Sequence, residues 1–329
     1  MTPTLLVSVD TEEEFDWSAP PCPDSRSVKH VAHLPRLQEL FESCGVRPTY
    51  LVDHPIATTG ESVDVLGGFL RRGACEIGAH LHPWVNPPVS EEICPKNTYL
   101  CNLPLALQQE KLAELTRAIH QAFGVSPVSF KAGRYGIDFA LLPALRELGY
   151  RLDSSVIAFT SFTDDGGPSF DRFSPEPFLL RPPLAPEANG HTPLLEIPCT
   201  VGFSRRPFRW WAAVQRGLSR APYRKLRLVG VCWHLRVFRK IVLSPELSDA
   251  AALVRLMQVM AKDRDLVLNL TLHSPSVEPG NTPFVRDRQE LDRFFHALQA
   301  ALQFAVRELG ARAMTLSEFE ADFRRNHAE

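Results

Sequence analysis

The feature that most limits the possible folds is an alternation between two kinds of segment along the 329-residue chain. Short runs of apolar and β-branched residues are followed by longer segments whose apolar residues recur at helical spacing. This alternation is typical of repeated β-α units around a parallel sheet or barrel. About eight runs are predicted strands: TLLVSVD (4–10), RPTYLVD (47–53), CEIGAHLH (75–82), PVSFKAG (127–133), YRLDSSV (150–156), LLEIPCTV (194–201), DLVLNLTLH (265–273) and RAMTLSEF (312–319). We therefore predict an α/β fold in which a barrel carries its chemistry on the loops at the carboxyl ends of its strands.

Helical segments separate these strands. The clearest is LPLALQQEKLAELTRAIHQAFG (103–124), and the segment VDVLGGFLRRG (63–73) ends at Gly73, in the position where glycine stops a helix. VAHLPRLQELFESCG (31–45) and DFALLPALRELG (138–149) have the same character. Each lies between two predicted strands, as the β-α arrangement requires.

Composition narrows the class of protein. A net charge of −2, with 44% hydrophobic and 22% charged residues, describes an ordinary globular protein and gives no reason to expect nucleic-acid binding. The seven cysteines contain no C-x-x-C pair, which disfavours a disulfide framework and a zinc knuckle. MTPTLLVSVDTEEEF lacks the basic start of a signal peptide, and no apolar run approaches the roughly 20 residues of a membrane span. We expect a cytoplasmic protein.

Residues 159–250 interrupt the alternation, and we interpret them as an insertion within a single domain spanning 1–329. The first part is rich in proline and glycine and indicates an ordered loop or a small β excursion. The second part has no acidic residue between Glu196 and Glu246 but carries many basic and aromatic residues at 205–240. Such a segment could be a lid over an anionic substrate, a peripheral contact with an acidic membrane, or a helical insertion packed on the barrel.

Two strand ends carry pairs of residues that can bind a metal. Side chains alternate along a strand, so Asp10 and Glu12 are expected on one face, with Thr11 opposite, and the same parity relates His80 and His82. Imidazole nitrogens and a carboxylate oxygen suit a divalent ion such as zinc, with a position left open for water. A histidine pair at this spacing is a weak signal by itself, because polar residues are common where strands end.

Other strand ends carry complementary groups. Lys131, Arg134 and Tyr135 lie at the carboxyl end of the fourth predicted strand, Asp153 at that of the fifth, and His273 at that of a late one. A cation beside a carboxylate can orient it, and a histidine in a cleft can donate a proton to a leaving group. Each has an ordinary structural explanation as a surface or turn residue, but together and in this order they favour a catalytic site.

The order of these segments resembles the NodB-type polysaccharide deacetylases, carbohydrate esterase family 4. The resemblance lies in SVDTEEEFDW, EIGAHLHPW, FKAGRYG, LDSSV and LTLHSPS, and the basic insertion falls outside it. It implies a distorted (β/α) barrel of about seven to eight strands. It also implies removal of N-acetyl, or sometimes O-acetyl, groups from sugars with a divalent metal, most commonly Zn²⁺, with Co²⁺, Ni²⁺ or Mn²⁺ as alternatives.

The resemblance also implies roles for individual residues. Asp10 matches the family's catalytic base, His80 matches the first metal histidine, and His273 matches the histidine that protonates the leaving amine. FKAGRYG corresponds to the segment that shapes the substrate groove and tethers the base, which makes Lys131 and Tyr135 expected groove residues. Asp153 takes the place of the carboxylate that orients the family arginine.

The chain departs from the family motifs at several positions. Thr11 replaces the family's metal-binding aspartate, so Glu12 is the expected substitute. The two histidines are separated by one residue and not three, so His82 is the expected second histidine ligand, and Trp84 is an expected substrate-binding residue. Lys131 stands where the family has arginine, which leaves Arg134 to supply a guanidinium to the site.

The expected function is therefore metal-assisted removal of an N-acetyl group from a sugar of a surface polysaccharide, or from its lipid- or nucleotide-linked precursor. Two alternatives remain open. The same barrel could hydrolyse another amide or C–N bond without metal, or a catalytically degenerate barrel could bind glycan or membrane through the basic segment. A glycosidase that uses Asp10 with Glu12, Glu13 or Glu14 is disfavoured, because carboxylates so close along one strand do not flank a sugar bond at the required separation of about 5 to 9 Å.

Overall fold

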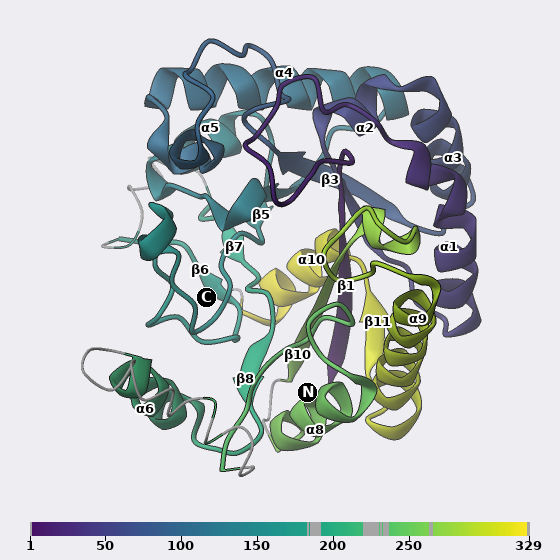
Figure 1. Cartoon of the computed structure of the whole chain (residues 1–329), viewed down its shortest axis with the longest axis vertical. Helices are drawn as coiled ribbons and strands as arrows, with labels where there is room; N and C mark the ends of the chain where they lie inside the picture. The colour runs from purple at the N-terminus through teal and green to yellow at the C-terminus, as the bar shows by residue number, and fades with distance from the viewer. Residues whose placement is uncertain are drawn as a thin grey trace.

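A parallel sheet surrounded by helices forms the body of the molecule (Figure 1). The computed structural model describes residues 2–182, 184, 192–219, 230, 232, 237–262 and 266–327. Its strands are β1 (Thr4–Thr11), β2 (Thr49–Val52), β3 (Glu76–Leu81), β4 (Ser129–Ala132), β5 (Leu152–Asp153), β6 (Phe178–Leu179), β7 (Leu195–Glu196), β8 (Val201–Phe203), β9 (Lys240–Val242), β10 (Val267–His273) and β11 (Arg312–Met314). Its α-helices are α1 (Leu34–Ser43), α2 (His54–Thr58), α3 (Gly60–Arg71), α4 (Leu105–Phe123), α5 (Leu142–Glu147), α6 (Phe208–Ser219), α8 (Ala250–Met260), α9 (Arg288–Gln303) and α10 (Leu316–Asn326).

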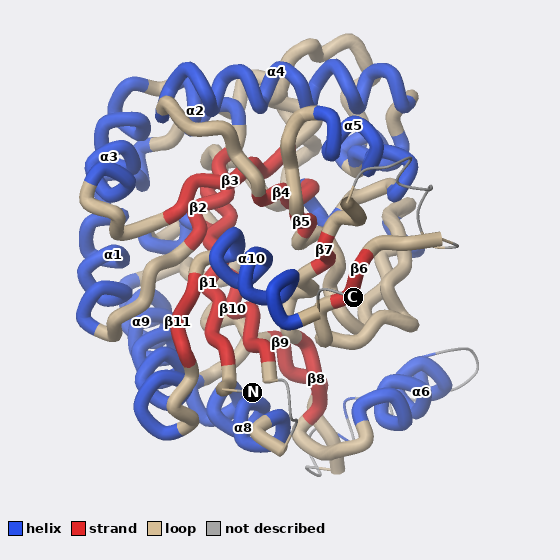
Figure 2. The backbone as a smooth tube through the Cα atoms, turned by 180° about the vertical axis from the view of Figure 1, so that it is seen from behind, coloured by secondary structure: helices blue, strands red, loops and turns tan. Residues whose placement is uncertain are grey.

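The main sheet has the strand order β10-β1-β2-β3-β4-β5-β7-β6, and β11 also pairs with β1. All of these pairs are parallel except β6 with β7. The sheet curls inside the helices, as seen from behind in Figure 2. The predicted α/β barrel architecture is confirmed.

Backbone hydrogen bonds outside the regular strand pairs join β10 to the residues that follow β7 and β9, so the sheet curls toward closure without a regular ladder at this junction. The amide N of Thr200, which follows β7, lies 3.2 Å from the carbonyl O of Asn269, and the amide N of Thr271 lies 3.1 Å from the carbonyl O of Leu243. β8 and β9 form a separate antiparallel pair next to this junction.

The two faces of the strands have different environments. In β1, Leu5, Val7 and Val9 are buried in the main hydrophobic core, while the alternate residues Leu6 and Asp10 lie on the opposite face. This alternation places one set of side chains under the helices and the other set inside the curled sheet. The alternation predicted from the sequence therefore separates the side chains packed under the helices from those that point inside the curled sheet.

Helix α10 covers the amino end of the barrel interior (Figure 2). Leu316 and Phe319 of this helix form a second hydrophobic cluster with interior side chains of the strands, among them Leu6, Leu51 and Leu152. Apolar burial of this kind is worth about 25 cal/mol per Å² removed from water. Among the described residues, α10 thereby covers the amino end of the barrel interior with apolar side chains.

Two sequence predictions about helix boundaries can be compared with the structure. Gly73 follows α3 in a left-handed conformation with φ of 67°, as predicted for a residue that stops a helix. The predicted strand at 312–319 was too long, because β11 ends at Met314 and α10 begins at Leu316. Thr315 and Glu318 form a reciprocal capping box, which starts the helix within the predicted strand.

The segment 159–250 contributes β6 and β7 to the edge of the main sheet, the pair β8 and β9, and helix α6, which lies at the periphery beside β8 (Figures 1 and 2). Several basic and aromatic residues of the predicted basic segment lie outside the described residues: Arg220, Tyr223, Arg224, Lys225, Arg227, Trp233 and Arg236. Among the helices that the structure describes, none has both the length and the apolar character needed to cross a bilayer.

Candidate active site

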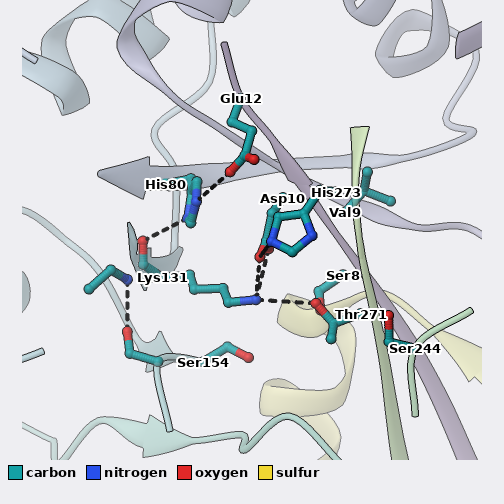
Figure 3. Close-up of polar contacts among 12 residues, drawn as sticks. Ser8, Val9, Asp10, Glu12, His80, Lys131, Ser154, Ser244, Thr271 and His273 are labelled. Carbon is teal, nitrogen blue, oxygen red and sulfur yellow. Dashed lines mark hydrogen bonds and ion pairs between the residues drawn. The ribbon is translucent and has the colours of Figure 1, made fainter. Parts of the chain in front are cut away.

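An ion pair between β1 and β4 occupies the carboxyl end of the barrel interior (Figure 3). The Nζ of Lys131 lies 2.9 and 2.6 Å from the two carboxylate oxygens of Asp10 and 3.2 Å from Oγ1 of Thr271. The side chains of Asp10 and Lys131 are 3% and 1% exposed, so each charge depends on the other. Burial alone would lower the pKa of Lys131, but the carboxylate of Asp10 holds it above its ordinary value. Lys131 therefore stays protonated and fixes the orientation of Asp10.

His273 lies beside this pair at the end of β10. The register of β1 and β10 places Asp10 opposite His273, and their side chains approach to 3.8 Å between Oδ2 and Nε2. On its other side, Nδ1 of His273 lies 2.9 Å from Oε2 of Glu246, and the backbone amide of His273 donates to Oε1 of the same residue at 3.1 Å. Burial opposes protonation of His273, but Glu246, Glu12 and Asp10 together raise its pKa to about 10. The raised pKa favours the charged form of the ring at neutral pH, and its Nε2 is directed toward Asp10.

A buried carboxylate and two imidazoles form a second group. Oε2 of Glu12 lies 3.3 Å from Nε2 of His80 and 3.3 Å from Nε2 of His82, and all three side chains are at most 3% exposed. These three ligand atoms lie close enough to hold one metal ion. Glu12 at the end of β1 therefore meets His80 and His82 at the end of β3, as the alternation of side chains along the strands predicted.

The hydrogen bonds around these imidazoles fit a cation between the three residues. Nδ1 of His80 faces the carbonyl O of Lys131 at 3.2 Å, so it must donate, and the neutral ring presents its lone pair at Nε2. Nδ1 of His82 lies 2.8 Å from Oε2 of Glu13, which accepts this hydrogen bond when ionised. Two lone pairs then face Oε2 of Glu12, whose other oxygen is buried and has no hydrogen-bond partner among the described residues. Such an electron-rich set of donors suits zinc.

The pKa values of this cluster follow from burial. Burial raises the pKa of Glu12 to about 8 and, together with the nearby charges of His82 and Lys131, lowers that of His80 well below its ordinary value. Burial also lowers the pKa of His82, against the attraction of Glu12. The two imidazoles are therefore neutral, which is the protonation state that a metal ligand requires.

Glycine at position 133 allows the approach between β3 and β4. A Cβ atom at Gly133 would lie 2.2 Å from Cδ2 of His82 and 2.8 Å from the carbonyl O of Leu81. The ring of His82 is held from the other side by Trp84, which stacks on it with 4.3 Å between ring centroids and an angle of 24°. His82 is thus fixed in orientation by its packing as well as by Glu13.

The structure does not bring Arg134 into this site. Its guanidinium contacts Thr98, donates to Oη of Tyr99 at 3.0 Å and reaches Asp165 at 3.2 Å. The backbone at Arg134 has φ of 52°, and this turn directs the side chain toward the outer loops. The cation that pairs with Asp10 is the ammonium of Lys131, which lies in β4. It takes the place of the guanidinium expected from Arg134.

Asp153 also lies apart from Arg134. It is buried next to Glu196, its register partner in β7, and Oγ of Ser155 donates to it. Burial raises the pKa of both Asp153 and Glu196. The position expected to orient an arginine is therefore part of a separate carboxyl pair inside the barrel wall.

Two predicted substrate-binding residues differ in accessibility. Tyr135 is half-buried, stacks on Phe162 at 5.5 Å, and has Lys131 Nζ 5.0 Å from its ring centroid, so it borders the Asp10 pair. Trp84 is only 3% exposed and packs against His82 and Phe15. The structure places Trp84 behind a candidate metal ligand, where it supports the ring of His82 and offers little surface to a substrate.

Sequence reasoning missed the groups that support the site. Glu246, which holds His273, comes from a loop 27 residues earlier, and Asp53, the N-cap residue of α2, accepts from the amide of Glu13 at 2.7 Å. Ser274 Oγ lies 2.7 Å from Nε2 of His30 and 3.2 Å from the amide N of Glu12. Glu246, Asp53 and His30 lie outside the segments that carry the family resemblance, whereas Ser274 lies in LTLHSPS and Glu13 in the DTEEEF run.

Comparison with known proteins supports the fold. No protein-family model and no curated protein sequence matches the chain. Among solved structures, it is similar to a protein assigned as a polysaccharide deacetylase from Mycobacterium smegmatis, with 16% identity, a TM-score of 0.57 and coverage of 99% of this chain and 92% of that one. It is also similar to a protein assigned as a glycoside hydrolase/deacetylase from Parabacteroides distasonis, with 12% identity, a TM-score of 0.62 and coverage of 99% and 72%.

PuuE allantoinase is a third similar structure, with 14% identity, a TM-score of 0.53 and coverage of 100% of this chain and 91% of that one. At these identities the likeness concerns the fold. The resemblance seen in the sequence is confirmed at that level: the chain has the fold of the NodB-type polysaccharide deacetylases.

Proposed function

We propose that this protein is a divalent-metal-dependent hydrolase that removes an N-acetyl group from a sugar. The observation that carries the proposal is the arrangement of three units at one end of the barrel. A carboxylate, Asp10, is held by Lys131; a protonated His273 is held by Glu246; and Glu12 lies with two imidazoles in a buried cluster. Amide hydrolysis needs a base, an acid and electrophilic assistance, and these units can supply all three.

The residues have separate tasks in this mechanism. Glu12, His80 and His82 would hold the metal, which when bound polarises an amide carbonyl and lowers the pKa of a water molecule. Asp10, fixed by Lys131, accepts a proton from the attacking water. His273 donates its Nε2 proton to the departing amine, since its raised pKa keeps it charged at neutral pH.

Two further parts of the site assist. We assign stabilisation of the oxyanion to a backbone N–H group near Tyr135, whose ring borders the Asp10 pair. Glu246 holds the ring of His273 through Nδ1 and leaves Nε2 free for the substrate. With Nε2 directed toward Asp10, both proton-transfer groups can reach one reacting amide.

Metal analysis with acetate release tests the proposal. Purified wild type should carry about one zinc or similar ion per chain and release acetate from at least one sugar in a panel of N-acetylated mono- and oligosaccharides. His80→Ala and His82→Ala should lose both properties, whereas His120→Ala, at an exposed histidine of α4, should keep both. Acetate release that persists in a variant carrying both His80→Ala and His82→Ala, and holding no metal, would contradict the proposal.

A second candidate is hydrolysis of another non-peptide C–N bond on the same barrel without metal. The similarity of fold to PuuE allantoinase is the reason for testing this candidate. Full activity toward a ureide or cyclic amide at less than stoichiometric metal would support this candidate over sugar deacetylation. Sugar binding by a metal-free wild type that hydrolyses nothing would indicate a degenerate barrel.

The sugar is proposed to be part of a surface polysaccharide precursor that carries a lipid or nucleotide phosphate, met by a cytoplasmic enzyme at an acidic membrane. Helix α6 supports this part of the proposal, because Trp210 is 54% exposed and follows the exposed Arg209. A tryptophan beside basic residues on a peripheral helix suits the interface of an anionic bilayer.

Vesicle sedimentation tests the membrane contact. Wild type should bind vesicles that contain an anionic phospholipid and ignore neutral ones, and Trp210→Ala with Arg209→Glu should reduce binding. Equal sedimentation of wild type and this double variant with anionic vesicles would refute a contact through α6.

A further inference from the structure

The indole of Trp17 stands at the rim of the candidate site with a large exposed surface. Trp17 follows β1 and is 38% exposed, whereas Trp84, on the other side of the site, is 3% exposed. One face of the Trp17 ring is covered, because Phe15 stacks on it with 4.9 Å between centroids and an angle of 21°. The exposed area therefore belongs to the part of the ring that Phe15 does not cover.

The same ring contacts the proposed proton donor. Trp17 meets His273 at 5.3 Å between centroids with an angle of 86°, and it meets Phe284 at 5.4 Å with an angle of 74°. Phe284 in turn lies nearly parallel to His273, at 6.0 Å and 18°. His273, Phe284 and Trp17 thus form a continuous surface from the reacting group outward to solvent.

An exposed tryptophan in this position is not explained by packing alone. A half-covered indole leaves apolar surface in water, and an aromatic residue needed only for the core is normally buried, as Trp84 is. The nearby charges are already paired, since Glu246 holds His273 and Lys131 holds Asp10. The exposed part of the Trp17 ring is therefore able to contact a flat, partly apolar ligand surface.

We propose that Trp17 is a stacking platform for a pyranose ring of the substrate. The C–H groups on one face of a pyranose are weakly positive and suit the negative face of an indole, while the hydroxyl groups at the ring edge remain in water. Stacked on Trp17, a sugar ring lies within reach of Nε2 of His273. The proposal rests on the proposed function and adds the part of the substrate that is recognised: a sugar ring next to the amide, and not the amide alone.

Trp17 is a positioning residue in this proposal, so its effect should fall on binding. With N-acetylglucosamine oligomers of one to four units, Trp17→Ala should raise KM by about fivefold to tenfold and change kcat much less. Trp17→Phe should restore part of the loss because it keeps a ring, and Leu105→Ala, which removes a comparably exposed apolar side chain from α4, should leave KM unchanged.

A second readout separates this proposal from the proposed function. Titration with the deacetylated oligomers, which cannot turn over, should quench tryptophan fluorescence in the wild type and much less in Trp17→Ala. Hydrolysis with KM and quenching unchanged in Trp17→Ala overturns the platform and leaves the deacetylase function standing. Trp17-dependent quenching in a wild type that releases no acetate overturns the function and keeps the platform. A loss of kcat alone would show that Trp17 acts only through His273, which also overturns the platform.

Discussion

The two ends of the barrel interior are built from the same strands but are stabilised in opposite ways. At the amino end, Leu6 and Leu152 pack against Leu316 of α10 in a cluster of hydrocarbon side chains. At the carboxyl end, Asp10 and Lys131 are buried as a charged pair. Burial of apolar groups is favourable by itself, whereas buried charges are tolerated only when paired, so each residue at the carboxyl end depends on a specific neighbour.

This difference between the two ends indicates which end of the barrel can carry a functional site. A closed apolar end tolerates replacement by other hydrocarbons of similar volume. At the carboxyl end, removal of either Asp10 or Lys131 leaves the other as a buried charge without a partner. We therefore expect substitutions at the amino end to change stability alone, and substitutions at the carboxyl end to change activity, stability or pH dependence in distinguishable ways.

The largest effect is expected for His273→Ala, which removes the proposed acid. Steady-state acetate release should fall about 10²- to 10⁴-fold, because the leaving amine loses its proton donor. Metal content should not change, since His273 is not among the proposed ligands. An unchanged rate would remove His273 from the mechanism.

The next effect concerns stability at the carboxyl end. Lys131→Met leaves the carboxylate of Asp10 buried and unpaired, so the free energy of unfolding should fall by about 3 to 5 kcal/mol in urea titrations. The double variant Asp10→Asn with Lys131→Met should recover most of this loss and remain inactive. If the single and double variants were equally unstable, the side chain of Lys131 would matter for packing and not for charge.

At the amino end, Leu316→Ala should lower the free energy of unfolding by about 2 to 5 kcal/mol through the cavity it leaves. The kcat and KM of the folded protein should match wild type at a temperature where both are folded. A large change in kcat would mean that the two ends are coupled, and the comparison above would not hold.

The smallest effect is expected for Glu246→Gln. Loss of the carboxylate removes a cause of the raised pKa of His273, about 10 in the wild type, so the proton donor deprotonates at lower pH. The alkaline limb of the pH–rate profile should therefore move down by about one pH unit or more, with a modest change in rate at neutral pH. A limb that stays in place would show that a different group titrates there.

The fold could be predicted from the sequence because its signals are local. Alternating apolar runs and helical segments marked the strands and helices, and parity along β1 and β3 indicated which side chains point into the interior. Where a boundary was misjudged, at β11, the capping residues Thr315 and Glu318 had been present in the sequence but were included in a predicted strand. At this boundary an apolar strand pattern and a helix-capping pattern overlap, and the capping residues start the helix.

The site could be predicted only in part. Asp10, Glu12, His80 and His82 stand at strand ends, and parallel strands bring such ends together. The sequence did not decide which cation pairs with Asp10, because Lys131 in the strand and Arg134 in the following loop are both close enough along the chain to do so. The turn after β4 decides between them, since it directs Arg134 outward.

By itself, the sequence determined the α/β architecture, the inward-facing residues of the strands and the set of residues at their carboxyl ends, because these depend on periodicity and chain order. Only the tertiary structure decided which residues meet: Lys131 with Asp10, Glu246 with His273, Glu13 with His82, and Trp17 with His273. Such pairings join residues far apart in the chain, and they depend on turn geometry and on the curl of the sheet, neither of which has a local pattern.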